Sequence, residues 1–557
     1  MTRFILIALF SVSFLCSSSS QQTVGLFFND STSYNGYTLF APSASRTTYL
    51  INNCGEVINT WTSTYTPGAS VYLLENGNLL RTARINGSFN GGGAGGRLEL
   101  FSWEGDLLWR YNYAADTVHQ HHDIQPLPNG NILILAWELR TPEEAIAAGR
   151  NPVTTPSVGI WSEQVVEVEM IGENEINIVW EWHLWDHLVQ DFDTSKVNYG
   201  IIADHPERLD INYTGGTGGP VGNPDWVHLN SIDHNPELDQ IILSSRTTNE
   251  IYVIDHSTTT EEAAGSTGGH AGKGGDFLYR WGNPAVYDRG LPSDQKFYGQ
   301  HNATWVPPGY PDAGKIMVFN NGQGRPGGNY STVDVLAPPL NADGSYYLEE
   351  NQPFGPNELF WEYMADPPTD FYSSRISGAQ RLPNGNTLVC EGAEGHFFEI
   401  DYEGAIVWDY VSPISGNNPV PQGSNPSQND VFRTLRYGPD YGAFIDKDLT
   451  PGSPVELDPM DTGCQIFGGE TTSVNEGMSN QVKVLTNPFQ DRILLQNDAG
   501  LTLGIEIIDI SGKRLFYSTT KNNYLEIDTA FWSKGLYVLR IYDKGMNPHF
   551  TQKIIKL

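Results

Sequence analysis

Basic residues are scarce in this chain of 557 residues. Lysine and arginine total 32 against 65 aspartate and glutamate residues, which gives a formal net charge of −33. A surface of that sign repels nucleic acid and anionic membrane lipids, so we exclude both as partners. Any site that binds an anion must therefore gather basic side chains locally.

Long apolar runs are missing after the first 22 residues. No later stretch reaches about 18 consecutive apolar residues, so we expect no transmembrane helix. The opening MTRFILIALFSVSFLCSSSSQQ has one arginine, a short apolar segment and then small residues. This order is typical of a signal peptide, which we assign to residues 1–20.

Cysteine is rare, with four in the chain, one of them inside the predicted signal peptide. Cys54, Cys390 and Cys464 remain, so at most one intramolecular disulfide forms, and the sequence alone does not choose the pair. Cys390 lies in the strand-like TLVCEG and is typical of a buried apolar filler. We favour Cys54 with Cys464, because both lie in polar, turn-like segments at the two ends of the main domain.

Helical periodicity is scarce, whereas Gly (58), Pro (34), Trp (14) and Tyr (27) are abundant. Short runs rich in Val, Ile, Tyr and Trp alternate with turns, which predicts an all-β fold. A turn followed by strand residues and a tryptophan recurs, as is typical of β-propeller blades. We predict a six-bladed β-propeller over 21–465, closed with the help of segment 429–444. Its blades are marked by Trp61, Trp109, Trp182, Trp281, Trp361 and Trp408.

Three histidine-bearing segments begin strand-like runs at the same place in the repeat. They are HQHHDIQPLPNGN (119–131), WVHLNSIDHNPELDQ (226–240) and QHNATWVPPG (300–309). If the blades are arranged radially, His122, His228 and His301 converge on one point. A convergent group of histidines predicts a chemical site.

Several motifs follow one another in order: WVHLNSIDHNPELDQIILSSR, GGDFLYRWGNP, QHNATWVPPG and VFNNGQGRPGG. Together they resemble the bacterial arylsulfate sulfotransferases, over a region from about residue 70 to about residue 445. The resemblance implies a six-bladed propeller that moves a sulfuryl group from an aryl sulfate to a phenol. It also implies a covalent sulfohistidine, no nucleotide sulfate donor such as PAPS, and no cofactor.

The resemblance transfers residue by residue. The QH segment, with the FNNG that follows, makes His301 the expected nucleophile, and the HxNS and SSR segments supply an anion cradle. For the histidine of the HHD segment three residues compete. We favour His122, because it shares a strand face with Gln120 and aligns with Asn230. The expected catalytic residues are His301, His228, Arg246, His122 and His121, and the expected substrate-binding residues are Asn230, Arg325, Asn321 and His119.

These residue types suit the reaction without the resemblance. Sulfuryl transfer needs a nucleophile, positive donors around the sulfate oxygens and a proton donor for the leaving phenolate. Neutral imidazole is a nitrogen nucleophile near pH 7. An arginine fork matches two sulfate oxygens, and a second histidine can move the phenol proton.

Other interpretations use the same residues. Clustered histidines with Asp123 and Asp233 suggest a divalent metal site, although the spacing matches no zinc signature and no cysteine joins it. An aryl sulfatase would use the same residues with water as the acceptor. A non-catalytic propeller would only bind sulfated ligands.

Composition changes after about residue 470, where 466–480 reads as a polar linker. Alternating strands joined by short turns then predict a small β-sandwich over 481–557. Its NPF, IIDISGK and KGLYVLRI segments resemble the type IX secretion sorting domains of Bacteroidetes. That resemblance implies export by the type IX machinery to a secreted or cell-surface location. The sequence does not specify the natural donor and acceptor, or whether the chain forms a homo-oligomer.

Overall fold

The computed structural model describes residues 22–214, 223–467, 482–484, 489, 491–497, 503–509, 513–522, 524–542 and 548–556. The chain forms two compact units, Met1–Ile466 and Phe467–Leu557. The predicted signal peptide and almost all of the predicted linker lie outside the described residues. The domain boundaries drawn from the sequence therefore stay predictions.

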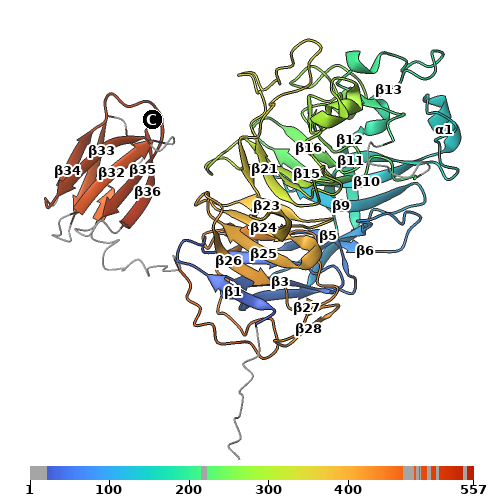
Figure 1. Ribbon diagram of the computed structural model, residues 1–557. Coiled ribbons are helices and arrows are strands. Elements are labelled where there is room, and N and C mark those ends of the chain that lie inside the picture. Colours follow the sequence, from blue (N-terminus) through green and yellow to red (C-terminus); the bar gives the residue numbers. More distant parts are fainter. Residues whose placement is uncertain are drawn as a thin grey trace, which may run out of the picture. The chain divides into compact units, whose positions relative to one another are not determined.

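Six larger antiparallel sheets make up the described part of the first unit (Figure 1). The innermost strands of successive sheets contact or hydrogen-bond one another, so the sheets follow each other like propeller blades. From the innermost strand outward, the first three sheets are β5 (Pro67–Leu73), β6 (Leu79–Arg84), β7 (Gly96–Phe101), β8 (Leu107–Asn112); β9 (Val118–Pro126), β10 (Ile132–Arg140), β11 (Ile160–Ile171), β12 (Glu175–His183); and β15 (Leu229–Asn235), β16 (Gln240–Ser245), β17 (Glu250–Asp255), β18 (Tyr279–Trp281).

The other three sheets complete the ring. They are β19 (His301–Trp305), β20 (Ile316–Asn320), β21 (Thr332–Leu336), β22 (Trp361–Tyr363); β23 (Gly378–Arg381), β24 (Thr387–Glu391), β25 (His396–Ile400), β26 (Ile406–Val411), β1 (Gly25–Asn29); and β29 (Leu435–Tyr437), β2 (Tyr37–Phe40), β3 (Thr47–Asn52), β4 (Val57–Thr62). The all-β prediction and the blade-like sheets are thus confirmed.

Short elements lie in the connections. Helix α1 begins at a capping box, in which the Thr141 side chain accepts from the backbone N–H of Glu144. The short elements are α1 (Pro142–Ala147), α2 (Thr260–Ala263), β13 (Leu188–Val189), β14 (Leu209–Asp210), β27 (Ile414–Ser415), β28 (Asn418–Pro419), and the 3-10 helices Leu184–Asp186, Ile202–Asp204, Pro284–Tyr287, Pro292–Asp294, Pro368–Asp370, Gly392–Glu394 and Gly442–Phe444.

The six marker tryptophans link each sheet to the next. Each lies on the fourth strand of its sheet. Each indole N–H donates to a backbone carbonyl oxygen in or beside the connection before the fourth strand of the following sheet, at 2.8 to 3.1 Å. The pairs are Trp61 with Ser102, Trp109 with Glu175, Trp182 with Gly275, Trp281 with Pro356, Trp361 with Tyr402, and Trp408 with Asn53. The tryptophans therefore pack between blades, as predicted.

The two ends of the first unit close the ring together. Strand β29, from the segment expected to help in closure, pairs with β2 from the other end of the unit. Strand β1 adds a fifth strand outside β26. Cys54 and Cys464 form a disulfide across a sequence separation of 410 residues, so the favoured pairing is confirmed. Cys390 is the buried free thiol on β24, also as predicted.

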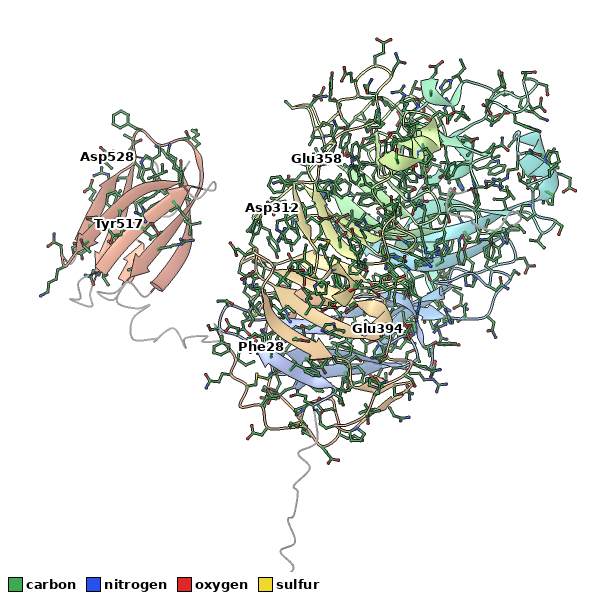
Figure 2. The ribbon with its side chains drawn as sticks, viewed as in Figure 1. Phe28, Asp312, Glu358, Glu394, Tyr517 and Asp528 are labelled. Carbon is green, nitrogen blue, oxygen red and sulfur yellow. A yellow bond between two sulfur atoms is a disulfide. The ribbon has the colours of Figure 1, made fainter. Side chains whose placement is uncertain are left out.

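The second unit contains two sheets that share one hydrophobic core, which fits the predicted sandwich. Tyr517 and Asp528 lie on its strands β33 and β34 (Figure 2). Its strands are β30 (Val482–Val484), β31 (Arg492–Asn497), β34 (Tyr524–Asp528) in one sheet, and β33 (Arg514–Thr520), β32 (Leu503–Asp509), β35 (Gly535–Tyr542), β36 (Pro548–Lys556) in the other. Among the described residues of the whole chain, none of the helices has the length and apolar character needed to cross a membrane.

We expect Cys54→Ser to lower the free energy of unfolding by about 2–4 kcal/mol, because the long covalent loop no longer restricts the unfolded chain. Guanidinium unfolding with and without a reductant measures this. Reduced wild-type protein should match the variant, and Cys390→Ala should retain the sensitivity to reductant. A Cys54→Ser variant as stable as the oxidised wild type would contradict the role of the disulfide.

Candidate active site

A pocket of about 440 Å³ opens where the innermost strands of the six sheets begin. His122 on β9, His228 just before β15 and His301 at the start of β19 all line it. The three histidines expected to converge are therefore brought together. The pocket is lined by Ser43, Pro67, Gly68, Ala69, Arg84, Gly92, Gly93, His122, His228, Arg246, His301, Arg375, Ile376, Asp430 and Phe432.

Backbone irregularities lie in or next to the strand starts that carry the pocket histidines. The register shifts in the pairing of β9 with β10, of β15 with β16, and of β19 with β20. In or next to these shifts His122, His228 and Asn302 adopt left-handed conformations, with φ of 50°, 54° and 52°. A left-handed conformation costs a non-glycine residue about 1–3 kcal/mol of conformational free energy, and such strained residues cluster at functional sites.

The tautomer of His301 is fixed by its neighbours. Its Nδ1 lies 2.7 Å from Oδ1 of Asn321 and 3.1 Å from the carbonyl oxygen of Gly299. The Asn321 amide nitrogen donates to the carbonyl oxygens of Ser373 and Ile376, which orients its own oxygen toward the imidazole. Nδ1 therefore carries the proton, and the lone pair lies on Nε2.

Burial also keeps His301 neutral. Desolvation, followed by the positive charge of Arg246, lowers the pKa of His301 to about 3. A neutral imidazole with a free lone pair is the form that acts as a nucleophile. Asn321 contacts the nucleophile candidate and orients it, and its expected role in substrate binding stays a prediction.

His228 is paired with a carboxylate. Its Nδ1 lies 2.5 Å from Oδ2 of Asp225, whose Oδ1 accepts from the Trp137 indole at 3.2 Å. The contact places a proton on Nδ1 of His228 and fixes the orientation of its ring. Beside it, the Arg246 guanidinium donates to Oε1 of Gln323, and its backbone N–H donates to the carbonyl oxygen of His228.

The HHD segment divides between the pocket and the layer behind it. His122 lines the pocket, while His121 lies behind it with Nδ1 2.8 Å from Nδ1 of His122. The other ring nitrogen of His121 lies 2.8 Å from Glu163, and its ring stacks on Trp137. His119 is buried beside Phe89 and outside the pocket lining.

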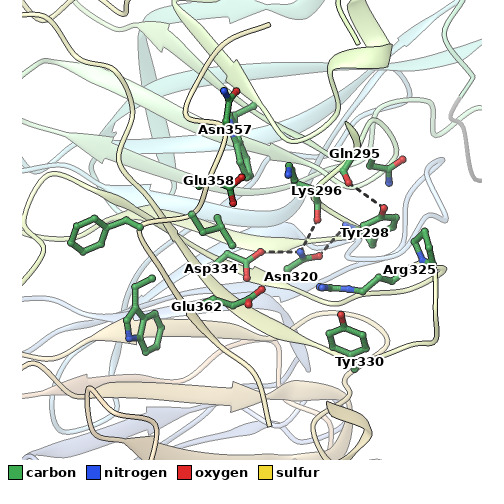
Figure 3. Close-up of a pocket in the computed structure, with 15 residues that line it drawn as sticks. Gln295, Lys296, Tyr298, Asn320, Arg325, Tyr330, Asp334, Asn357, Glu358 and Glu362 are labelled. Atoms are coloured by element: carbon green, nitrogen blue, oxygen red, sulfur yellow. Dashed lines mark hydrogen bonds between the residues drawn. The ribbon is translucent and has the colours of Figure 1, made fainter. Parts of the chain in front are cut away.

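Two other expected substrate-binding residues lie outside this pocket. Asn230 is buried, and its amide donates to the carbonyl oxygen of Gln300 at 2.7 Å, which joins neighbouring inner strands. Arg325 lies in a separate cavity of about 620 Å³, between the rings of Tyr298 and Tyr330 (Figure 3). Their roles in substrate binding stay predictions.

The carboxylates of the metal alternative are engaged elsewhere. Asp123 accepts two hydrogen bonds from the Arg433 guanidinium, at 2.9 and 3.0 Å. Asp233 accepts from the backbone N–H groups of Trp305 and His234. Within the described residues, the cluster with metal-like geometry is a different one, formed by His234, Asp239 and His256.

The structure adds residues to the expected catalytic and substrate-binding set. Arg84 and Arg375 bring two more guanidinium groups to the pocket, whereas exposed residues such as Glu358 and Glu394 are acidic (Figure 2). Asp225 and Glu163 stand directly behind the histidines. Only Asp225 gave a local signal, three positions before His228, while Arg84 and Glu163 come from other strands.

His301 should remain neutral at pH 5, because burial and the charge of Arg246 disfavour its protonated form. NMR of protein labelled with ¹³C in its histidine rings would follow the resonance, identified from its loss in His301→Gln. Arg246→Gln should raise this pKa toward the ordinary value, and Arg110→Gln, an exposed residue on β8, should not. Protonation of wild-type His301 near pH 6.5 would contradict the geometry.

Two protein-family models match most of the chain. A protein-family model described as Arylsulfotransferase (ASST) matches residues 27–407, and one described as Secretion system C-terminal sorting domain matches residues 483–557. The second match indicates secretion or a cell-surface location. The arylsulfate sulfotransferase AssT of Escherichia coli O6:H1 is 27% identical over 189 residues, which cover 33% of this chain and 30% of that protein.

Solved structures of low similarity were also found. A protein of unknown function from Bacteroides caccae has a TM-score of 0.39 at 12% identity, covering 72% of this chain and 99% of that one. A catalytically inactive virginiamycin B lyase from Staphylococcus aureus, solved with quinupristin, has a TM-score of 0.33 at 10% identity, covering 71% and 90%.

Proposed function

We propose that this chain, which belongs to the arylsulfotransferase family, is an exported enzyme that moves a sulfuryl group from a phenolic sulfate ester to a phenolic acceptor. The observation that carries the proposal is the state of His301. Its imidazole is neutral, its proton is held on Nδ1, and it faces a pocket that also contains Arg246.

In the first step, Nε2 of His301 attacks the sulfur of the donor. The N–S bond forms as the bond from sulfur to the phenolic oxygen breaks, and the donor leaves as a phenol after taking up a proton. The Arg246 guanidinium holds the sulfate oxygens during this transfer, since charged donors stabilise developing negative charge in the pocket. His228 lies beside it, and the Asp225 carboxylate keeps the His228 ring oriented.

In the second step, an acceptor phenol occupies the place of the first product. Its oxygen attacks the sulfuryl group on His301 while its proton passes to a pocket base, and the imidazole is released neutral. We assign the proton transfers of both steps to His122, because it lines the pocket next to His228 and His301 and can donate or accept through Nε2. No nucleotide sulfate donor or metal takes part in this scheme.

His301→Ala should lower the transfer of the sulfuryl group from p-nitrophenyl sulfate to phenol by about 10³-fold or more, because it removes the nucleophile. Release of nitrophenolate and formation of phenyl sulfate measure the reaction, and mass spectrometry of wild-type protein without acceptor should find a sulfuryl adduct on His301. His205→Ala, in a loop outside the pocket, is the control.

Each alternative predicts a different product. Hydrolysis at the same rate with and without phenol would indicate an aryl sulfatase. Binding of the sulfate ester without turnover or adduct would indicate a non-catalytic propeller. A His301→Ala variant as fast as wild type would exclude His301 as the nucleophile, and loss of activity in EDTA would support the metal alternative.

Arg246→Gln should lower kcat/KM for p-nitrophenyl sulfate by about 10²–10³-fold, since one charged donor to the transferring group is lost. Steady-state kinetics with saturating phenol measure the effect, with Arg110→Gln as the matched control on the outside of β8. An Arg246→Gln variant with unchanged kcat/KM would exclude Arg246 from the anion site.

A further inference from the structure

A line of short polar contacts runs from the pocket into the interior of one blade. It begins at His122, continues 2.8 Å away at His121 through the two Nδ1 atoms, and ends 2.8 Å further at Oε2 of Glu163. All three side chains are buried. His121 and His122 belong to β9, while Glu163 reaches them from β11 across the strand β10 that carries Trp137.

Each of these contacts needs one proton between its two heavy atoms, and with both imidazole rings neutral this leaves two patterns. In the donor pattern, Glu163 is a neutral acid that donates to Nε2 of His121. His121 then donates from Nδ1 to Nδ1 of His122, and His122 presents an N–H at Nε2. In the acceptor pattern every proton has moved one place toward the pocket, Glu163 is a carboxylate, and Nε2 of His122 presents a lone pair.

The surroundings favour the donor pattern at rest. Burial, and then the nearby charge of Asp225, raises the pKa of Glu163 well above its ordinary value, although a hydrogen bond from the Leu229 N–H opposes this. The carboxylate of Glu138 also faces Glu163. A neutral Glu163 beside neutral imidazoles avoids an unpaired buried charge.

The histidines of the line face other histidines and an arginine. Burial lowers the pKa of His121 and His122 well below the ordinary value, and the charge of His228 adds to this effect at both. His119 faces His121, and His301 and Arg246 face His122. Since the neutral state of both rings is preferred, a proton that enters at His122 is passed on rather than kept there.

Access to the pocket end depends on a glycine. The backbone N–H of His122 donates to the carbonyl oxygen of Gly93, at 2.7 Å. Gly93 has a φ of 75°, and a Cβ there would lie 2.3 Å from Nε2 of His122. Because glycine has no such atom, the Nε2 edge of His122 stays beside the pocket instead of being covered.

From this geometry we propose that Glu163 and His121 form a proton relay that stores, on Glu163, the proton that His122 exchanges with the two phenols. The proposal rests on the sulfuryl transfer proposed above and adds two positioning residues to it, which act on the reacting atoms only through His122.

In the first step, the relay supplies the proton that the leaving phenolate takes up. As the N–S bond to His301 forms and the S–O bond breaks, His122 gives its Nε2 proton to the leaving phenolate oxygen. His122 takes the proton of His121 at Nδ1, and His121 takes the proton of Glu163 at Nε2. The product leaves as a neutral phenol, and the negative charge stays on Glu163.

The second step reverses the shift. The acceptor phenol gives its proton to Nε2 of His122, His122 returns a proton to His121, and His121 returns one to Glu163. The acceptor oxygen bonds to sulfur as the N–S bond breaks. Without Glu163 as the store, His122 would have to become an imidazolate between the two steps, because its only proton would leave with the first product.

Glu163→Gln tests the relay, because a glutamine amide can donate to His121 but cannot give up its proton in the reaction. We expect this variant to retain single-turnover formation of the His301 adduct from p-nitrophenyl sulfate within about threefold, since nitrophenolate leaves without protonation. With phenyl sulfate, whose leaving group has a pKa of about 10, the rate should fall by about 10²–10⁴-fold.

The control variants separate the relay from other effects. Glu169→Gln changes an exposed carboxylate on β11, the strand that carries Glu163, and should match wild type with both donors. Asp225→Asn should slow both donors to the same extent, because it weakens the anion cradle. His121→Gln breaks the relay at a second place and should repeat the profile of Glu163→Gln, with unfolding midpoints measured for every variant.

The outcomes distinguish the two proposals. A Glu163→Gln variant that slows both donors equally would overturn the relay while leaving the sulfuryl transfer intact. If the Asp225→Asn variant is instead slowed only with phenyl sulfate, the proton given to the leaving group comes from the pair of Asp225 and His228. That result would also overturn the relay. Failure of wild-type protein to form an adduct with either donor would overturn the sulfuryl transfer, and the relay with it.

Discussion

Six indole N–H groups, each bonded to a carbonyl oxygen of the next blade, hold the sheets of this chain in a ring. One such hydrogen bond contributes only about 1 kcal/mol to stability. Because the six bonds run around a closed ring, each sheet is bonded to both of its neighbours. The ring fixes the innermost strands around one axis. Residues from β9, β15 and β19, far apart in the chain, meet at the pocket for that reason.

The pocket is rich in arginine, although the chain as a whole is acidic. The protein carries a formal net charge of −33, yet Arg84, Arg246 and Arg375 line this one cavity. Burial then lowers the pKa of His301, while the Asp225 carboxylate orients His228. Imidazoles of equal intrinsic basicity are thereby placed in different surroundings, as separate roles in nucleophilic and acid–base catalysis require.

The fold could be read from the sequence because its marks are local and repeated. Each tryptophan lies at the end of a short strand pattern, and the two turn-like cysteines fall at the ends of the domain. The site was only partly readable. Counting alternate residues along β9 favoured His122, which does line the pocket, but a bulge breaks that alternation, and the side chain of the adjacent His121, behind the pocket, still contacts His122.

Residues that come from other blades had no signal of their own. Glu163 reads as one acidic residue in a strand, and Arg84 as a strand end, because their importance arises only when the ring closes. Nothing in the sequence indicated that Asn321 contacts the imidazole of His301. Side chains that orient other side chains depend on tertiary contacts, which periodicity and spacing do not encode.

The bond between Cys54 and Cys464 joins the two ends of the ring covalently. Disulfides persist outside the cytoplasm and are reduced within it. Before export, the closing sheet is therefore held by hydrogen bonds and packing alone, which favours a chain that can still be unfolded for transport. After oxidation the disulfide links this sheet covalently to the end of the unit. Proteolytic removal of the residues beyond Cys464 would leave that link in place.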